Sequence, residues 1–449
     1  TIEREVRESS TGAGFTFSSP YNYDGMVYIG NQNFVRCAEE QKRYDKCFSL
    51  LICVTKGSTH YDFVKTAFPS DYFKVGSSRE EIAELMFNDT CNVVAHDKSS
   101  IQNVAILNDG IRDGKFILGA KMMTKEPLAI VSRNNDREFS DIINWVVQAL
   151  YFGEEQGLTK DPTLCQNYTN MTLHDVSDLD FLNAVYCVGN YGEITYGELW
   201  DMNQINNGTG MLYAVPFGNL DKDTIVGPAD GSVLAKIRNE GSLNCGVVVP
   251  DNFVGNVRGS NKLVGMGVDY CRTLAAAIFI GDSEEVNFST FTETDNSSFG
   301  ALANGTIDVL VGGRVQRKYD FEMSPFLGGF HFSTPYYYGN EASREDVSFY
   351  SLATREDDVQ FASFVNCMVL ATIHAQGNDI HREKSREMPS CSVFGSGLNW
   401  ALRDAIAYSG SYDEIYSRNF GSNVSEAYRG RNTLNKGGPL MLSFPHLPR

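Results

Sequence analysis

A ten-residue segment that occurs twice constrains the fold of this chain more than any other feature. Residues 14–23 read GFTFSSPYNY and residues 329–338 read GFHFSTPYYY, with seven of the ten positions identical. The offset between the two segments is 329 − 14 = 315 residues. Self-similarity of this kind indicates a structural unit that has been duplicated within the chain. We therefore expect two copies of one module.

Two further repeated segments show that the copies differ in length. FSDIINW at 139–145 matches FASFVNC at 361–367 with an offset of 222, and NYGEI at 190–194 matches SYDEI at 411–415 with an offset of 221. The offset thus falls by 315 − 221 = 94 residues, and the loss lies between residues 340 and 361. The segment of the first copy that has no counterpart in the second copy is about residues 31–135. A loss of this size is one lobe of a small α/β domain rather than a trimmed loop.

Apolar runs alternate with amphipathic segments along the chain. The predicted strands are 47–54, 91–95, 244–250, 288–291 and 307–311, and the predicted helices are 79–87, 269–280 and 297–303. Residues 56–59, Lys-Gly-Ser-Thr, stand where a buried strand leads into the start of a helix. This alternation predicts an α/β protein with mixed, mostly parallel sheets that are flanked by helices.

Composition excludes several classes of function. The net charge is −18 and the chain contains no basic run, which disfavours nucleic acid or an anionic membrane as a partner. No apolar stretch reaches the ~18 residues of a membrane helix. The sequence lacks the motifs of nucleophile elbows, phosphate loops and zinc proteases, so we expect no enzyme activity, no cofactor and no metal. Because the chain opens on Thr1 and polar residues, it resembles a mature product whose targeting peptide has been removed.

Cysteine number and glycosylation triplets favour a secreted protein. The chain has ten cysteines, none with Cys-x-x-Cys spacing. Eight Asn-x-Ser/Thr triplets also occur, and although chance could supply some of them, together with the even number of cysteines they favour a eukaryotic secretory route. The eight acceptors are Asn88, Asn167, Asn170, Asn207, Asn287, Asn296, Asn304 and Asn423.

Four groups of segments resemble the periplasmic amino-acid-binding proteins of ABC uptake systems, specifically the general L-amino-acid group. They are 241–247 with 265–279, 52–59 with 91–99, 125–128 continuing to 157–159, and 188–194. The resemblance implies a type 2 solute-binding fold, in which two hinge strands connect two lobes and the ligand lies between them. The chain would then be a degenerate tandem duplication of this fold.

The resemblance also implies a division of the chain. Residues 15–24 and 126–132 would be the hinge strands of the first copy, and the second copy would lack lobe 2. The expected parts are 1–30 for the end of lobe 1 and the hinge, 31–135 for lobe 2, 136–229 for the C-terminal lobe 1 helices, and 230–449 for the second copy, which has lobe 1 only.

A ligand site follows from the same resemblance. Arg7 would bind the carboxylate of an amino acid through its guanidinium, Asp97 would bind the ammonium group, and Gly57, Ser58 and Thr59 would offer helix-start contacts. In the second copy Arg317 stands at the position of the arginine clamp, but Gly312 and Gly313 replace larger polar residues. Ordinary structural roles remain open, since Arg7 is close to the chain start and Asp97 could cap a turn. His96 is interpreted as a core or supporting residue beside Asp97.

The family resemblance extends to the cysteines. It implies the disulfides Cys53–Cys91, on adjacent strands of lobe 2, and Cys245–Cys271, between a strand and a helix of lobe 1. The remaining six cysteines are then expected to pair as Cys37–Cys47, Cys165–Cys187 and Cys367–Cys391.

Two functions fit these features. In the first, the chain is a structural or assembly subunit, because the first copy has lobe 1 helices without most of the strands on which they should pack. Copies of the chain joined head to tail, or a cleaved upstream fragment, would then cover the exposed face. In the alternative, the first copy binds an amino acid or a similar zwitterion. The sequence favours the structural interpretation over the binding one.

Overall fold

The computed structural model describes most, but not all, of the chain. The described residues are 15–18, 20–124, 126–133, 136–166, 181–194, 231–249, 255–256, 263–292, 297–312, 330–338, 349–355, 357–390, 394–395 and 397–421. They fall into two compact units. Unit 2 contains residues 21–128, and unit 1 contains the other described residues.

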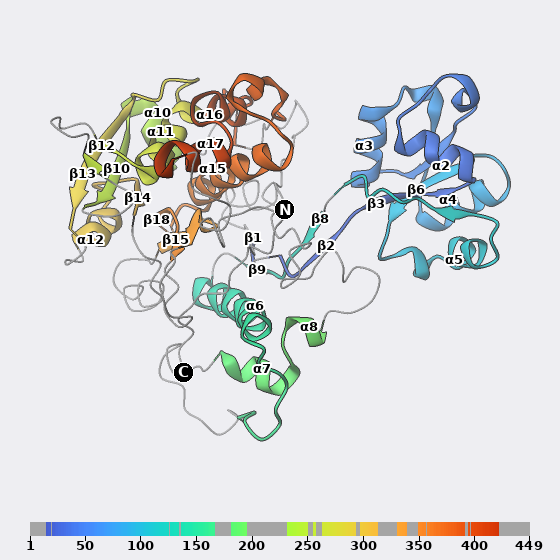
Figure 1. Cartoon of the computed structure of the whole chain (residues 1–449), viewed down its shortest axis with the longest axis horizontal. Helices are drawn as coiled ribbons and strands as arrows, with labels where there is room; N and C mark the ends of the chain where they lie inside the picture. Colours follow the sequence, from blue (N-terminus) through green and yellow to red (C-terminus); the bar gives the residue numbers. More distant parts are fainter. Residues whose placement is uncertain are drawn as a thin grey trace. The chain divides into compact units, whose positions relative to one another are not determined.

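Unit 2 is built around a mixed five-stranded sheet (Figure 1, blue to cyan). The strand order is β5-β4-β6-β3-β7, with β4 parallel to both β5 and β6, and β3 antiparallel to both β6 and β7. The elements are β2 (Asn22–Asp24), β3 (Met26–Gly30), α2 (Gln32–Glu39), β4 (Ile52–Thr55), α3 (Thr59–Ala67), β5 (Phe73–Gly76), α4 (Arg79–Phe87), β6 (Val93–Asp97), α5 (Ala105–Arg112), β7 (Ile117–Leu118) and β8 (Glu126–Leu128).

Both faces of this sheet are buried, which explains the continuous apolar runs of its central strands. Successive residues of a strand point to opposite faces. Met26 and Tyr28 of β3 accordingly join one core with α2 and α3, while Val27 and Ile29 join a second core with α4 and α5. An α/β layer structure of this kind requires apolar side chains at every central position.

The second copy, in unit 1, contains a related sheet (Figure 1, yellow to red). Its order is β13-β10-β14-β18-β15, with the first two pairings parallel and the last two antiparallel. Its elements are α10 (Val233–Glu240), β10 (Leu243–Val248), β11 (Gly255–Asn256), β12 (Leu263–Val264), α11 (Met266–Ile278), β13 (Val286–Phe291), α12 (Ser297–Ala303), β14 (Val309–Val311), β15 (Phe330–Phe332), β16 (Tyr337–Tyr338), β17 (Phe349–Tyr350), β18 (Ala353–Arg355), α15 (Val359–Gly377), α16 (Ala401–Ser409) and α17 (Tyr412–Phe420).

This sheet also has a core on each face. A large core joins β10 and β14 to α10, α11, α15, α16 and α17, and a smaller core places α12 against β10, β14, β15 and β18. The parallel strands are those connected through helices, as the sequence predicts. The strands β15 and β18 pair antiparallel to each other, because the chain reverses its direction between them.

The first copy contributes a smaller set of elements to unit 1. They are β1 (Phe15–Phe17), β9 (Val131–Arg133), α6 (Arg137–Gln156), α7 (Leu182–Val188) and α8 (Tyr191–Ile194). Trp145 and Ala149 of α6 pack against Phe181, Leu182 and Val185 at α7. Strand β9 pairs with β1 and with no other strand in the described part of the chain.

The repeat seen in the sequence recurs in the strand pairing of the two copies. In the first copy β1 and β9 are antiparallel with Phe15 opposite Arg133. In the second copy β15 and β18 are antiparallel with Phe330 opposite Arg355. These partners are related by the offsets 330 − 15 = 315 and 355 − 133 = 222, so the register is the same in both copies.

The next strand pair shows where the copies diverge. Asn22 of β2 lies opposite Leu128 of β8, and Tyr337 of β16 lies opposite Tyr350 of β17. The offsets are again 337 − 22 = 315 and 350 − 128 = 222. The second copy therefore keeps the antiparallel pair. The first copy has residues 25–125 between its two strands, whereas the second copy has only residues 339–348.

Helix starts are repeated in the same way. The side chain of Asp136 accepts the backbone N–H of Phe139 at 3.1 Å before α6, and Asp358 accepts that of Phe361 at 2.8 Å before α15. Both aspartates are N-caps, which satisfy a backbone donor that the helix itself leaves open.

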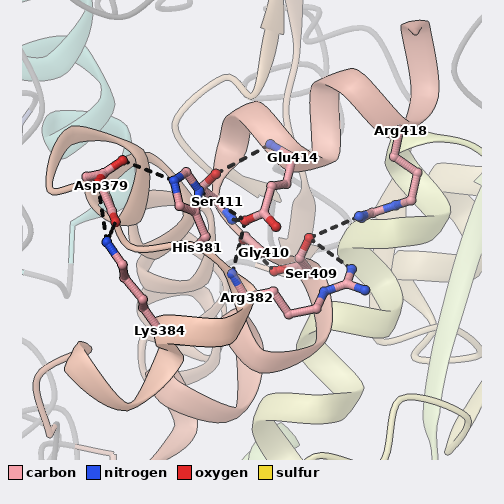
Figure 2. Close-up of polar contacts among 9 residues, drawn as sticks. All are labelled: Asp379, His381, Arg382, Lys384, Ser409, Gly410, Ser411, Glu414 and Arg418. Atoms are coloured by element: carbon pink, nitrogen blue, oxygen red, sulfur yellow. Dashed lines mark hydrogen bonds and ion pairs between the residues drawn. The ribbon is translucent and has the colours of Figure 1, made fainter. Parts of the chain in front are cut away.

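The corner between α16 and α17 is held by charged side chains (Figure 2). Arg382 and Arg418 both donate to the carbonyl of Ser409, at 3.5 and 3.1 Å, at the end of α16. Cations are favoured at this end of a helix because its last carbonyls carry partial negative charge. Glu414 accepts the backbone N–H of Ser411 at 2.8 Å and forms a capping box for α17.

Candidate functional site

The predicted site residues of the first copy gather at one edge of the unit 2 sheet. Strands β4 and β6 are parallel neighbours, so Thr55 at the end of β4 and Asp97 at the end of β6 stand at the same edge. The carboxyl ends of parallel strands are the usual position for ligands in open α/β sheets.

The start of helix α3 follows β4 at this edge. Gly57 has φ = +73°, a conformation that favours glycine, and it turns the chain from the strand into the helix. Ser58 is the N-cap, and its Oγ accepts the backbone N–H of Tyr61 at 3.1 Å. Gly57 and Thr59 are exposed. The positive end of a helix dipole is therefore presented to solvent here, and it suits an anionic group.

Asp97 presents a carboxylate beside this helix start. Its side chain is 36 % exposed, and Oδ1 lies 2.8 Å from Nε2 of His60. The hydrogen bond from His60 lowers the pKa of Asp97 below its ordinary value, against the opposing effect of burial. Within the described residues, no other group bonds this carboxylate, so Oδ2 can accept a further donor.

His60 is the residue that sequence reasoning missed. The sequence singled out His96, next to Asp97, as the histidine adjacent to the site. In the structure His96 is buried, burial lowers its pKa, and its Nδ1 lies 3.2 Å from the carbonyl of Asp97. The histidine that reaches the carboxylate is His60, in the first turn of α3, because the parallel pairing of β4 and β6 brings that turn to the end of β6. Its position directly after Ser58-Thr59 was the available signal.

The chain after Asp97 is fixed by a second carboxylate. Asp24 at the end of β2 is buried, and its Oδ1 accepts the backbone N–H of Ser99 at 3.3 Å and that of Gly25 at 2.8 Å. The hydroxyl of Ser99 donates to Oδ2 of Asp24. The N–H of Lys98 donates to the carbonyl of Gly25 at 3.0 Å. The loop that follows β6 is thus bonded to the end of β2.

Of the other residues that the sequence singled out for the two ligand positions, only Gly312 is among the described residues. Arg7, Gly313 and Arg317 lie outside the described residues. Gly312 follows β14 with φ = +77°, a second position where the backbone favours glycine. The described residues contain no group of three or more side chains arranged to hold a metal ion. None of the described helices has both the length and the apolar character required to cross a bilayer.

Four disulfides have the pairing predicted from the sequence. They are Cys37–Cys47, Cys53–Cys91, Cys165–Cys187 and Cys245–Cys271. Cys391 lies outside the described residues, so the pairing predicted for Cys367 stays a prediction. The second and fourth bridges tie a sheet strand to the following part of its own lobe, because Cys53 is in β4 and Cys245 is in β10.

Three of the eight glycosylation triplets are in described residues. Asn88 follows α4, Asn287 is in β13 and Asn304 follows α12, and all three side chains are exposed. The remaining acceptors, Asn167, Asn170, Asn207, Asn296 and Asn423, lie outside the described residues.

Comparison with known proteins identifies relatives of one kind. The putative amino-acid ABC transporter-binding protein YhdW of Escherichia coli is 23% identical over 239 residues, which are 46% of this chain and 66% of that protein. The general L-amino acid-binding periplasmic protein AapJ of Rhizobium johnstonii is 24% identical over 250 residues, which are 48% of this chain and 68% of that protein. The chain therefore spans about two thirds of the length of these relatives. No protein-family model matches it.

Solved structures of solute-binding proteins are also similar to parts of the chain. A periplasmic binding protein of an ABC transporter from Brucella ovis, solved with glutathione bound, matches 47% of this chain and 100% of its own, with 18% identity and a TM-score of 0.35. The holo form of ArgBP from T. maritima matches 35% and 61%, with 15% identity and a TM-score of 0.24. The relatives confirm the resemblance to amino-acid-binding proteins that the sequence indicates. The two five-stranded sheets, with helices packed on both faces, confirm the α/β fold class.

Proposed function

We propose that the chain is a non-enzymatic binding protein for an α-amino acid or a similar zwitterion, acting through unit 2. The observation that carries the proposal is the pairing, at one sheet edge, of the start of α3 with the Asp97 carboxylate. Unit 2 would correspond to lobe 2 of a solute-binding protein. The named amino-acid-binding relatives support this function over that of an assembly subunit.

The chemistry of the two groups suits the two ends of a zwitterion. A ligand carboxylate would be stabilised at the positive end of the α3 dipole, next to Gly57 and Ser58. A ligand ammonium group would donate to Asp97, whose carboxylate is ionised at neutral pH and whose pKa the His60 bond lowers further. Arg7 is proposed as a further carboxylate ligand.

Isothermal titration calorimetry against the twenty standard L-amino acids tests this function. At least one should bind the unaltered protein, and Asp97→Asn should weaken that binding at least tenfold because the charge-assisted bond to the ammonium group is lost. Asp71→Asn, which changes an exposed carboxylate at another place in unit 2, is the matched control and should leave the affinity unchanged. Arg7→Ala should weaken binding if Arg7 is a ligand. Absence of binding for all twenty would rule the function out.

The location that fits these features is outside the cytoplasm. Disulfides persist in oxidising compartments, and four are present in the described part of the chain. We propose a eukaryotic secretory route, supported by the exposure of Asn88, Asn287 and Asn304 in their triplets. Treatment of the native protein with an N-glycanase should lower its mass and convert occupied asparagines to aspartates. An unchanged mass would leave the disulfides as evidence for a periplasmic location instead.

A second candidate function, as an assembly subunit, is favoured by one specific observation. Apolar positions that are buried in the second copy are exposed in the first copy. Val131 is 52 % exposed and its counterpart Ala353 is 3 % exposed, while Ile194 is 42 % exposed and Ile415 is fully buried. Apolar side chains that are exposed in one copy and buried in the other are candidates for contact with a partner. Light scattering coupled to size-exclusion chromatography tests whether the chain self-assembles. A stable monomer over a range of concentrations would exclude self-assembly.

A further inference from the structure

We propose that His60 is a positioning residue, which holds the Asp97 carboxylate in the orientation that receives the ligand ammonium group. The inference rests on the proposed function and assigns a role to a side chain outside the predicted ligand set. Two features carry it: the bond from His60 to one oxygen of Asp97, and the independent anchoring of the loop that follows Asp97.

The two oxygens of the Asp97 carboxylate have different roles: Oδ1 binds His60, and Oδ2 is available to the ligand. Nε2 of His60 donates to Oδ1 at 2.8 Å, and the imidazole is 8 % exposed, so it is fixed by its surroundings in the first turn of α3. Oδ2 is left for an incoming donor. A free aspartate side chain would rotate about two bonds and lose that freedom when the ligand binds. The bond to His60 removes part of this entropic cost before binding.

The backbone beside Asp97 is fixed from the other side. The Asp24 carboxylate bonds both the N–H and the hydroxyl of Ser99, and Lys98 is bonded to the carbonyl of Gly25. Asp97 is therefore held at its side chain by α3 and just beyond its backbone by the end of β2. A side chain that contacts a ligand keeps the orientation needed for binding only when neighbouring residues hold it in place.

The surroundings of His60 are closed on the side of β6. Asp97 and His96 face it from that strand, and the rings of His60 and His96 are 6.3 Å apart between centroids. His60 is therefore packed beside the strand end whose carboxylate it contacts, and its removal should be felt at Asp97.

The experiment compares His60→Gln, which keeps a donor, with His60→Leu, which has no donor. The probes are the twenty L-amino acids, each titrated alone at pH 7.5. His60→Leu should bind about tenfold more weakly than the unaltered protein, the cost of losing one charge-assisted bond. His60→Gln should bind within about threefold of the unaltered protein. His381→Leu removes a 3.0 Å histidine–aspartate contact, to Asp379 in unit 1, and should leave the affinity unchanged (Figure 2).

The outcomes separate this inference from the proposed function. Equal affinity of His60→Leu and the unaltered protein overturns the positioning role while the binding function stands. If the unaltered protein binds none of the twenty probes, the binding function fails, and amide hydrogen exchange at residues 97–100 without ligand then decides on the role of His60. Exchange there should be faster in His60→Leu than in the unaltered protein and near normal in His60→Gln. Unchanged exchange in His60→Leu overturns the inference, and circular dichroism confirms that each variant is folded.

Discussion

Phe139 and Phe361 occupy the same position of the internal repeat, yet Phe139 is 53 % exposed and Phe361 is 1 % exposed. Both follow an N-cap aspartate by three residues, so the local structure around them is equivalent. The difference arises in the packing: Phe361 joins the large core between α15 and the parallel strands of its sheet. The same residue in equivalent local structure should therefore contribute different amounts to stability in the two copies.

This pair yields a direct stability comparison. Phe361→Ala should lower the free energy of unfolding by about 3–5 kcal/mol, because it leaves a cavity in a closed core. Phe139→Ala should cost less than about 1 kcal/mol, because little apolar contact is lost. Urea unfolding with hydrogen exchange of the α6 and α15 peptides measures both. A loss above 3 kcal/mol for Phe139→Ala would mean that a partner covers this position in solution.

The two capping boxes should be worth similar amounts. Before α8, Asn190 Oδ1 accepts the N–H of Glu193 at 2.9 Å, and Glu193 Oε2 accepts that of Asn190 at 2.9 Å. Ser411 and Glu414 make the same reciprocal bonds before α17 (Figure 2). Asn190→Ala and Ser411→Ala should each cost about 1 kcal/mol. Hydrogen exchange of the helix that follows should rise in each variant and stay unchanged in the other helix, and a uniform rise along the chain would contradict a local effect.

The Cys53–Cys91 disulfide should stabilise unit 2 by limiting the freedom of the unfolded chain. It closes a loop with a sequence separation of 38 residues, for which chain entropy predicts about 4 kcal/mol. The Cys53→Ala/Cys91→Ala variant should unfold at correspondingly lower urea. The Cys37→Ala/Cys47→Ala variant, with a separation of 10 residues, is the control and should lose about 3 kcal/mol. Equal stability of the first variant and the unaltered protein would show that the bridge is absent in the native protein.

Acid stability should report the bond between Asp97 and His60. The pKa of Asp97 is lower in the folded state than in the unfolded chain, so its contribution to stability is present above the ordinary aspartate pKa. That contribution is lost as the pH falls through the lowered folded-state value. Urea unfolding of unit 2 between pH 5 and pH 2 should therefore lose stability more gradually in Asp97→Asn than in the unaltered protein. Asp71→Asn is the control, and parallel curves for Asp97→Asn and the unaltered protein would contradict the lowered pKa.

Much of the local structure follows from local pattern. The helix predicted at 79–87 coincides with α4, and the helix predicted at 297–303 coincides with α12, because both have clear caps or apolar periodicity. Predicted strands near 91–95 and 244–250 form as β6 and β10 with shifted ends. The antiparallel strands β3 and β18 were not predicted as such, because strand direction depends on distant partners rather than on the strand's own residues.

The candidate site divides in the same way. Gly57, Ser58 and Asp97 were proposed as ligand residues through the family resemblance, and only the helix start at residues 56–59 also left a local signal. The Asp24–Ser99 contact left no such signal, and His60 left only its position after Ser58-Thr59. The reason is that the two contacts join residues 75 and 37 positions apart.

The sequence by itself determined that segments of the chain are repeated, that the second copy is 94 residues shorter between its repeated segments, and which family the module resembles. These properties follow from the order of the repeated segments and the spacing between them, both of which can be read from the sequence. Only the tertiary structure decided that strand pairs on either side of the deletion keep one register, that His60 rather than His96 reaches Asp97, and that Phe139 is exposed where Phe361 is buried. The physical reason is that hydrogen-bond partners and burial are set by contacts between residues far apart in the chain. The spacing of the repeated segments does not predict those contacts.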